Sequence, residues 1–176
     1  MRHTIKTTAD IQKENGARIK ELQKQFPECK GEPIIHFDGQ YGFLSNFYHS
    51  LITLDGYNFL NGEAAFQAFK DLDRIEEFAT IKPSRAKSLG RQVKLRPDWE
   101  QVKTSIMEKV VFAKFSQNLD LQKKLLATGD RLLVEGNWWN DTTWGVSNGR
   151  GENRLGIILM NVRKQLREKK GAVLYI

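Results

Sequence analysis

A segment rich in tryptophan and glycine constrains this chain more than any other feature of its sequence. Three indoles and one acid, Asp141, lie within residues 138–145, and the glycine-rich turn 148–156 follows directly. This composition suits neither a helix nor a plain core strand. Tryptophans offer flat faces for stacking on a ring, and glycines let backbone N–H groups approach a ligand closely. The segment therefore predicts a binding pocket.

The glycine-rich turn leads into an apolar periodic run, residues 155–163, which predicts the start of a buried helix. The N–H groups and the positive dipole at such a helix start favour an anion, and phosphate is the natural candidate. The spacing is not that of a Walker loop, because no Gly-Lys-Ser/Thr follows. It is not a dinucleotide fingerprint either, because Arg154 stands where the third glycine should fall. Phosphate binding and an ordinary glycine-rich surface turn both remain open.

Length and cysteine content limit the class of protein. With 176 residues and 40% hydrophobic content, the chain is long enough for one well-buried domain. We expect that domain at residues 34–176, after a polar helical extension at residues 1–33. The single cysteine, Cys29, excludes an internal disulfide framework, and three scattered histidines make a metal centre improbable. Neither a membrane-spanning run nor a signal peptide is recognisable, so we expect a cytoplasmic protein with no membrane partner.

The charge balance favours anionic partners. Lysines and arginines number 28 against 21 aspartates and glutamates, a net charge of +7. Such a surface attracts nucleic acids, nucleotides and phosphorylated metabolites. An alternative is that the excess serves solubility, since part of it lies in the segment 163–170, where cations suit the end of a helix.

Periodicity and turn signals predict a mixture of helices and short strands. Apolar spacing, caps and breakers place helices at 4–26, from the N-cap Asn61 onward, and at 84–89, 97–116, 119–127 and from 155 onward. Alternating or short apolar runs predict strands at 34–37, 51–54, 57–60, 132–135 and 173–176, with a turn at 55–56. The first helix carries only a thin apolar stripe, which predicts weak docking or a partner-binding role.

Several polar and aromatic residues are candidates for a site. Glu63 lies in the first turn of a helix, where the macrodipole keeps it ionised, and shares a polar stripe with Gln67 and Lys70. First-turn acids are also routine in helices, so this position alone does not make Glu63 functional. Asn46 is either a ligand for a base or ribose or the cap of a turn. Trp99 is either a core anchor or a stacking wall.

The chain resembles the NADAR family through an ordered set of motifs between about Ile35 and Arg167. The matching segments are Phe43-Leu44-Ser45-Asn46-Phe47, Glu63-Ala64-Ala65-Phe66-Gln67-Ala68, Ala86-Lys87-Ser88-Leu89-Gly90-Arg91, Leu95-Arg96-Pro97-Asp98-Trp99-Glu100, Ala113-Lys114-Phe115, Asp141-Thr142-Thr143-Trp144-Gly145, Gly151-Glu152-Asn153-Arg154-Leu155-Gly156 and Leu159-Met160.

The resemblance implies a fold, an activity and a set of site residues. The fold is α+β, a compact, mainly α-helical single domain with a few short strands. The activity is hydrolysis of N-glycosidic bonds without a cofactor or a metal. The implied substrates are ADP-ribose attached to a guanine base in nucleic acid and phosphoribosylated pyrimidine intermediates of riboflavin synthesis. The implied site contains the following residues: Glu63, Trp99, Asp141 and Trp144, surrounded by Asn46, Lys70, Gly149, Gly151 and Asn153.

One position departs from the family pattern. Many members carry His-Tyr after the helix glutamate, whereas this chain has Ala64-Ala65. Any role of that pair in holding substrate is therefore absent here, and the specificity of a particular member does not transfer directly.

Two carboxylates suffice for the implied chemistry. Breaking a ribose C1′–N bond develops oxocarbenium character on the sugar, which a nearby carboxylate stabilises, and a carboxylate can also activate water. We assign these roles to Glu63, while Asp141 orients the ribose or the leaving base. Two other functions stay open: a non-catalytic module that binds ADP-ribose or nucleotides, and a basic nucleic-acid module built on the N-terminal arm and residues 163–170.

Overall fold

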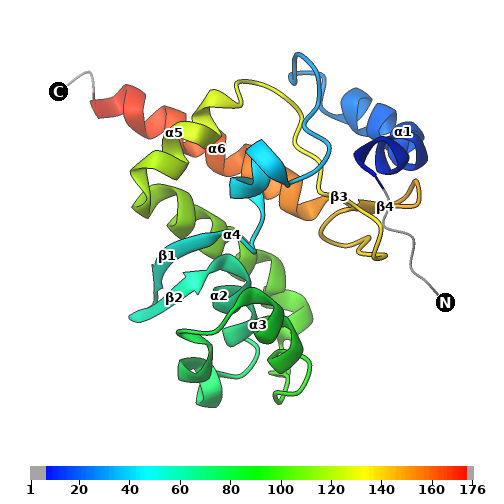
Figure 1. The fold of residues 1–176 in the computed structure, drawn as a ribbon. Helices are drawn as coiled ribbons and strands as arrows, with labels where there is room; N and C mark the ends of the chain where they lie inside the picture. Colours follow the sequence, from blue (N-terminus) through cyan, green and yellow to red (C-terminus); the bar gives the residue numbers. More distant parts are fainter. Residues whose placement is uncertain (1–6, 174–176) are drawn as a thin grey trace. The chain divides into compact units, whose positions relative to one another are not determined.

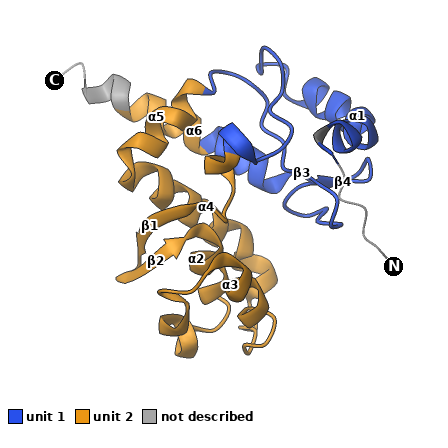
Figure 2. Ribbon diagram, in the orientation of Figure 1, with its two compact units in different colours: residues 1–41, 128–161 blue, residues 42–127, 162–176 orange. Residues whose placement is uncertain are grey.

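The computed structural model describes residues 7–173, and the chain divides into two compact units (Figure 2). Unit 1 consists of residues 1–41 and 128–161, and unit 2 consists of residues 42–127 and 162–176. Each unit therefore combines segments that are far apart in the sequence. The boundary between residues 161 and 162 falls inside the last helix.

A β-hairpin opens unit 2. Strands β1 (His49–Leu54) and β2 (Tyr57–Asn61) pair antiparallel, as the sequence predicts. Asp55 and Gly56 make the turn with φ angles of 50° and 85°, the left-handed conformations that a two-residue hairpin turn requires. Ile52 and Phe59 are partners across the hairpin, and both are 0% exposed, so one face of the hairpin forms part of the core.

Four helices follow the hairpin in unit 2. They are α2 (Gly62–Ala68), α3 (Pro83–Leu89), α4 (Trp99–Gln117) and α5 (Leu119–Ala127). The helices α2 and α4 pack against the hairpin, while α3 packs against α2 and α5 against α4. Figure 1 shows the hairpin beside α4, with α2 continuing directly from β2. Every residue of α2 is buried, which explains its small apolar composition around Glu63. Two 3-10 segments that periodicity did not predict, η1 (Gly39–Leu44) and η2 (Leu72–Phe78), complete the connections.

Unit 1 is organised around α1 (Thr8–Gln25) and two very short parallel strands, β3 (Gly136–Asn137) and β4 (Val146–Ser147). A reciprocal capping box between Thr7 and Asp10 fixes the start of α1. The thin apolar stripe of this helix packs inside unit 1, because Ile11, Ile19 and Leu22 are at most 7% exposed. The last helix, α6 (Arg154–Val173), begins in this unit.

The expected strands at 34–37 and 132–135 are wrong as extended elements. They reduce to one isolated parallel bridge between Ile34 and Leu133. The pairing between the two segments stops there because the Glu135 carbonyl accepts a hydrogen bond from Val146 N, the first residue of β4, at 2.8 Å. Val173 ends α6 and starts no strand, while residues 174–176 of the expected last strand and residues 4–6 of the expected first helix lie outside the described residues.

The fold class agrees with the sequence prediction of a mainly helical α+β protein with a few short strands. No helix within residues 7–173 combines the length and the apolar character that a membrane span requires.

Candidate active site

Glu63 lies in the first turn of α2 with its side chain only 9% exposed. Asn61 caps this helix, since its Oδ1 accepts from Ala64 N at 2.8 Å. The backbone N–H of Glu63 donates to the carbonyl of Asn46 at 2.9 Å, which ties the start of α2 to the turn before β1. Local backbone bonds on both sides of Glu63 thus fix the position from which its carboxylate projects.

Gln67 fixes the Glu63 carboxylate itself. Gln67 Nε2 donates to Glu63 Oε1 at 2.8 Å, one turn further along α2. Gly90 makes room for this amide, because a Cβ at residue 90 would stand 1.9 Å from Gln67 Oε1. Sequence reasoning placed Gln67 on the stripe of Glu63 through its i+4 spacing, but it gave neither Gln67 nor Gly90 a part in the site.

Lys70 lies near this carboxylate, and Trp99 lies near Lys70. Lys70 Nζ donates to the Gly90 carbonyl at 3.1 Å and lies 5.5 Å from the centroid of the Trp99 ring. Burial lowers the pKa of Lys70 from its ordinary value of 10.5; the charge of Glu63 acts in the opposite direction, and that of Arg91 lowers the pKa further.

Trp99 forms part of the core of unit 2. It is 6% exposed, and its ring packs on Phe66 with centroids 5.1 Å apart. Of the two roles considered for Trp99, this packing favours that of a core anchor. Its contact with substrate stays a prediction.

Asn46 presents a buried acceptor close to Glu63. The side chain is 7% exposed, and its Nδ2 lies 3.2 Å from the sulfur of Met107. Its Oδ1 has no hydrogen-bond partner among the described residues. Gly62 allows the Asn46 side chain to lie close to the start of α2, since a Cβ at residue 62 would stand 2.7 Å from Asn46 Oδ1. A buried acceptor of this kind suits a donor from a ligand, although its substrate-binding role stays a prediction.

Asp141 and Trp144 lie in the connection between β3 and β4 of unit 1. Asp141 Oδ1 accepts from the backbone N–H groups of Thr143 and Trp144 at 3.2 and 2.9 Å, the bonding of an Asx turn. The buried amide of Asn137 in turn holds the backbone N–H and carbonyl of Asp141 at 3.1 and 2.8 Å. One carboxylate oxygen of Asp141, the predicted catalytic acid, therefore stabilises the conformation of the loop that contains it. Asn137 is a further residue that sequence reasoning missed.

The remaining predicted residues, Gly149, Gly151 and Asn153, lie in the following turn of the same unit. Gly149 and Gly151 have φ angles of 75° and 138°, a backbone region that favours glycine. Asn153 is 0% exposed, and its amide bonds to the backbone of Leu133 and Glu135 at 2.9 and 3.0 Å. These contacts give Asn153 a structural part in the turn, while contact of all three residues with substrate stays a prediction.

The start of α6 favours the interpretation of an ordinary turn over a phosphate cradle. The N–H groups of Asn153, Arg154 and Leu155 donate to carbonyls of residues 143–145 at 3.0–3.2 Å. The N–H of Gly149 donates to Asn15 Oδ1 at 2.9 Å. An anion would have to displace these bonds, so the charge for a phosphate must come from side chains.

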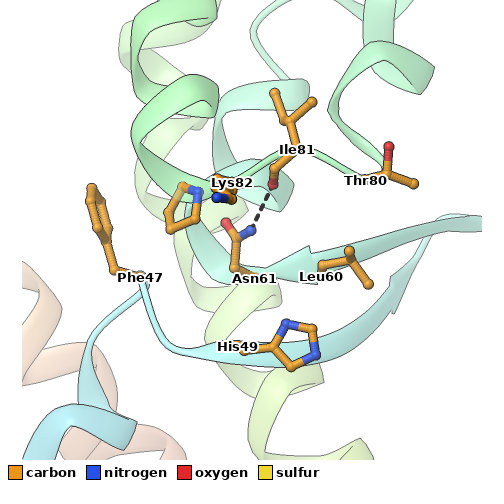
Figure 3. Close-up of a pocket in the computed structure, with 8 residues that line it drawn as sticks. Phe47, His49, Leu60, Asn61, Thr80, Ile81 and Lys82 are labelled. Carbon is orange, nitrogen blue, oxygen red and sulfur yellow. Dashed lines mark hydrogen bonds between the residues drawn. The ribbon is translucent and has the colours of Figure 1, made fainter.

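A surface pocket of about 240 Å³ lies in unit 2 near the start of α2 and α3 (Figure 3). Phe47, His49, Asn61 and Lys82 are among its lining residues, and none of the predicted site residues lines it. Figure 3 also shows Asn61 Nδ2 donating to the Ile81 carbonyl, at 3.0 Å. The volume is below the roughly 300–1,000 Å³ of most ligand sites, and the pocket contains no carboxylate, so we do not take it as the reaction site.

The predicted residues thus form two groups, one in each unit. Unit 2 brings Asn46, Glu63, Lys70 and Trp99 together around α2, and unit 1 contains the other five in residues 141–153, on either side of β4. Within residues 7–173, no cluster of three or more His, Cys, Asp or Glu side chains could hold a metal ion.

Comparisons with known proteins assign the family. The NADAR domain model matches residues 35–167. The chain is 41% identical over 148 residues to the N-glycosidase YbiA of Shigella flexneri, covering 79% of this chain and 92% of that protein. It is 38% identical over 149 residues to a riboflavin biosynthesis protein of Vibrio vulnificus, covering 78% of this chain but 39% of that longer protein.

A solved structure agrees with these relatives. The NMR structure of the E. coli protein YbiA has a TM-score of 0.70 and 39% sequence identity, and the match covers 81% of this chain and 90% of that one. The relatives named N-glycosidase bear out the predicted class of a hydrolase acting on N-glycosyl compounds. By both the family model and the identity to its relatives, the chain belongs to the NADAR domain family.

Proposed function

We propose that this protein hydrolyses the ribose C1′–N bond of an ADP-ribosylated base, such as ADP-ribosyl-guanine in nucleic acid, or of a phosphoribosylated pyrimidine intermediate of riboflavin synthesis. The names of the relatives support the type of bond, and the net charge of +7 suits either anionic substrate. We further propose that the reaction takes place in the cytoplasm.

The observation that carries this proposal is the fixed carboxylate of Glu63. It is 9% exposed, and Gln67 Nε2 holds one of its oxygens at 2.8 Å, leaving the carboxylate in a defined orientation. A carboxylate held in advance stabilises developing positive charge without the cost of reorientation. Lys70 lies near enough to Glu63 for the carboxylate charge to raise the pKa of Lys70, so a cation lies beside the acid.

In the proposed reaction, the C1′–N bond breaks as a water oxygen bonds to C1′. The electron pair of the broken bond leaves with the base nitrogen, and the sugar passes through an oxocarbenium-like transition state. Glu63 stabilises that charge and accepts a proton from the attacking water, and this proton ends on the leaving base nitrogen, which restores the carboxylate. The products are the free base, or its amine, and the ribose with a hydroxyl group on C1′.

The other residues bind and orient the substrate in this scheme. Lys70 supplies positive charge for a phosphate, and the buried oxygen of Asn46 accepts from a substrate donor. Asp141 orients the ribose or the leaving base. Trp144 is a half-buried indole in the same loop, and it stacks on the base in this proposal.

Glu63→Gln tests the central role. The substitution is nearly isosteric, so we expect kcat to fall by about 10³-fold while ligand affinity stays within a few fold. Steady-state kinetics would give kcat, and calorimetry with a product would give the affinity. Wild-type turnover by the variant would show that Glu63 does not carry the reaction.

A substrate panel distinguishes the possible reactions. Purified protein would be incubated with an oligonucleotide bearing ADP-ribosyl-guanine, with a phosphoribosylaminopyrimidine and with free NAD, and the products separated and weighed by mass spectrometry. Release of ADP-ribose with restored guanine would support action on modified nucleic acid, and release of the pyrimidine would support action on the metabolite. Binding of a nucleotide with all three substrates intact would favour the non-catalytic module.

A further inference from the structure

The N-terminal helix α1 lies outside residues 35–167, the part of the chain that matches the family model. Its buried stripe, formed by Ile11, Ile19 and Leu22, is interrupted by a polar residue, Asn15, which is only 1% exposed. A fully buried asparagine needs hydrogen-bond partners. Those partners show what the helix does.

Asn15 bonds to both sides of the turn that contains Gly149. Its Nδ2 donates to the Val146 carbonyl at 3.1 Å, and its Oδ1 accepts from Gly149 N at 2.9 Å. One side chain of α1 thus connects the first residue of β4 to the glycine turn. The same turn carries the predicted substrate-binding residues Gly149, Gly151 and Asn153.

Arg18 makes a second contact with this turn, about one helical turn further along the same face of α1. Its Nε donates to the Gly151 carbonyl at 2.9 Å, and its Nη1 pairs with the exposed Glu21. Arginine donates in a fixed planar geometry, so Arg18 defines the position of Gly151 as well as lying near it.

Close backbone packing brings α1 against the same region. A Cβ at Gly149 would lie 3.2 Å from the Glu14 carbonyl, and a Cβ at Gly136 would lie 3.3 Å from Ile11 Cγ2. Figure 1 shows α1 alongside β3 and β4, in agreement with these distances. The glycine turn is therefore supported by α1 through two side chains and through direct packing.

From these contacts we infer that α1 is a built-in support of the substrate loop, and that Asn15 and Arg18 are positioning residues that hold the turn 146–153 in the conformation that the structure shows. This inference rests on the proposed function for the identity of the loop as a substrate-binding element. The helix lies outside residues 35–167, so the family resemblance does not predict this support. It acts on binding, since neither residue needs to touch the reacting bond.

Two variants of the full-length protein test the inference. Asn15→Ala removes both side-chain bonds to the turn, and Arg18→Met removes the donor to Gly151 at similar side-chain length. For each we expect KM to rise about tenfold with kcat changed less than about twofold, because lost loop order weakens ground-state binding. Arg18→Lys, which keeps a cationic donor, should recover part of the affinity.

Hydrogen exchange supplies a readout that does not depend on activity. The Gly149 amide donates to Asn15, so its exchange should become at least about tenfold faster in Asn15→Ala while amides of the α4 core keep their protection. Glu21→Gln is the matched control, because it removes only the charge of the exposed partner of Arg18 and alters neither contact to the turn.

Three results would overturn the inference alone. The first is unchanged exchange of the Gly149 amide in Asn15→Ala, and the second is an unaltered KM in both α1 variants. Equal losses in kcat and melting temperature, with no rescue by Arg18→Lys, would likewise reduce α1 to a purely stabilising element. A wild-type chain that cleaves no substrate of the panel would instead defeat the proposed function, and that failure appears before any α1 substitution is made.

Discussion

The Glu63 carboxylate depends on a glycine that lies 27 positions further along the chain, at residue 90. Gly90 contacts the Gln67 amide that holds Glu63, and its carbonyl accepts from Lys70. One backbone position therefore contacts both charged residues of the predicted site in unit 2, Glu63 through Gln67 and Lys70 directly. Its φ angle of −63° is ordinary for any residue, so the glycine is needed for space and not for conformation.

Gly90→Ala should damage catalysis through this contact. The new Cβ would stand 1.9 Å from Gln67 Oε1, which forces the amide away from Glu63. We expect kcat to fall about tenfold and the free energy of unfolding to fall by about 1–3 kcal/mol, as for other overpacked sites. Steady-state kinetics and urea unfolding would measure the two effects. Gly42→Ala is the control, since a Cβ there meets nothing within 4 Å; equal kinetics in both variants would refute the argument.

Lys70 predicts a pH dependence of binding. Burial lowers the pKa of its ammonium from 10.5, so Lys70 loses its proton at a lower pH than an exposed lysine does. The protonated form attracts phosphate, and KM for a phosphate-bearing substrate should therefore rise as pH increases through this lowered pKa. Measurements of KM between about pH 7 and about pH 10 would follow the rise.

Two substitutions of Lys70 distinguish the loss of its own charge at high pH from the titration of other groups. Lys70→Arg keeps its charge throughout that range and should flatten the rise, because arginine stays protonated. Lys70→Met should have a raised KM at every pH, and its KM should not change with pH through residue 70, because methionine does not titrate. A wild-type rise that persists unaltered in Lys70→Met would assign the dependence to another group.

At the scale of elements, the end of α4 completes the edge of the hairpin. Gln117 Oε1 accepts from Thr53 N and its Nε2 donates to the Thr53 carbonyl, both at 2.8 Å, so one side chain imitates a neighbouring strand. Asn118 adds a bond from its Nδ2 to the Leu51 carbonyl at 2.9 Å. These bonds satisfy backbone groups of β1 that would otherwise be exposed at a sheet edge.

Gln117→Leu should therefore destabilise the hairpin. Two hydrogen bonds at a solvent-exposed edge are worth about 1–2 kcal/mol together, and we expect the free energy of unfolding to fall by about that amount. Urea unfolding followed by circular dichroism would measure it. Gln101→Leu makes the same change at an exposed position near the other end of α4, and a loss of stability as large there would contradict this role of Gln117.

The elements that sequence reasoning predicted well are those with local signals. Apolar periodicity and the N-cap at Asn61 located the helices, and the Asp55-Gly56 turn located the hairpin. The strands expected at 34–37 and 132–135 were wrong because hydrogen bonds to residues far away in the sequence determine how these segments pair. The Glu135 carbonyl accepts from Val146 N and not from the other expected strand. Asn15, Gly90 and Asn137 were missed as functional positions for the same reason, since their importance comes from contacts that no local pattern records.

At the scale of the whole molecule, the chain passes from unit 1 to unit 2 and back, and then returns to unit 2 within α6. The predicted site residues follow this division, with the acid Glu63 in one unit and the acid Asp141 in the other. The sequence resemblance identified the family from motifs in both units. It carried no information about α1, which lies outside the matched residues.

This arrangement of α1 determines the order in which the protein can fold during synthesis. Its contacts to the glycine turn span 131–134 residues, whereas residues 42–127 of unit 2 are continuous in sequence. A ribosome therefore makes α1 on the order of ten seconds before residues 146–151 exist at usual synthesis rates. Ile11, Ile19 and Leu22 stay without their native cover during that interval. The helix α1 can therefore reach its final place only after residues 146–151 have been made, and a pause in translation between the two segments would delay these contacts.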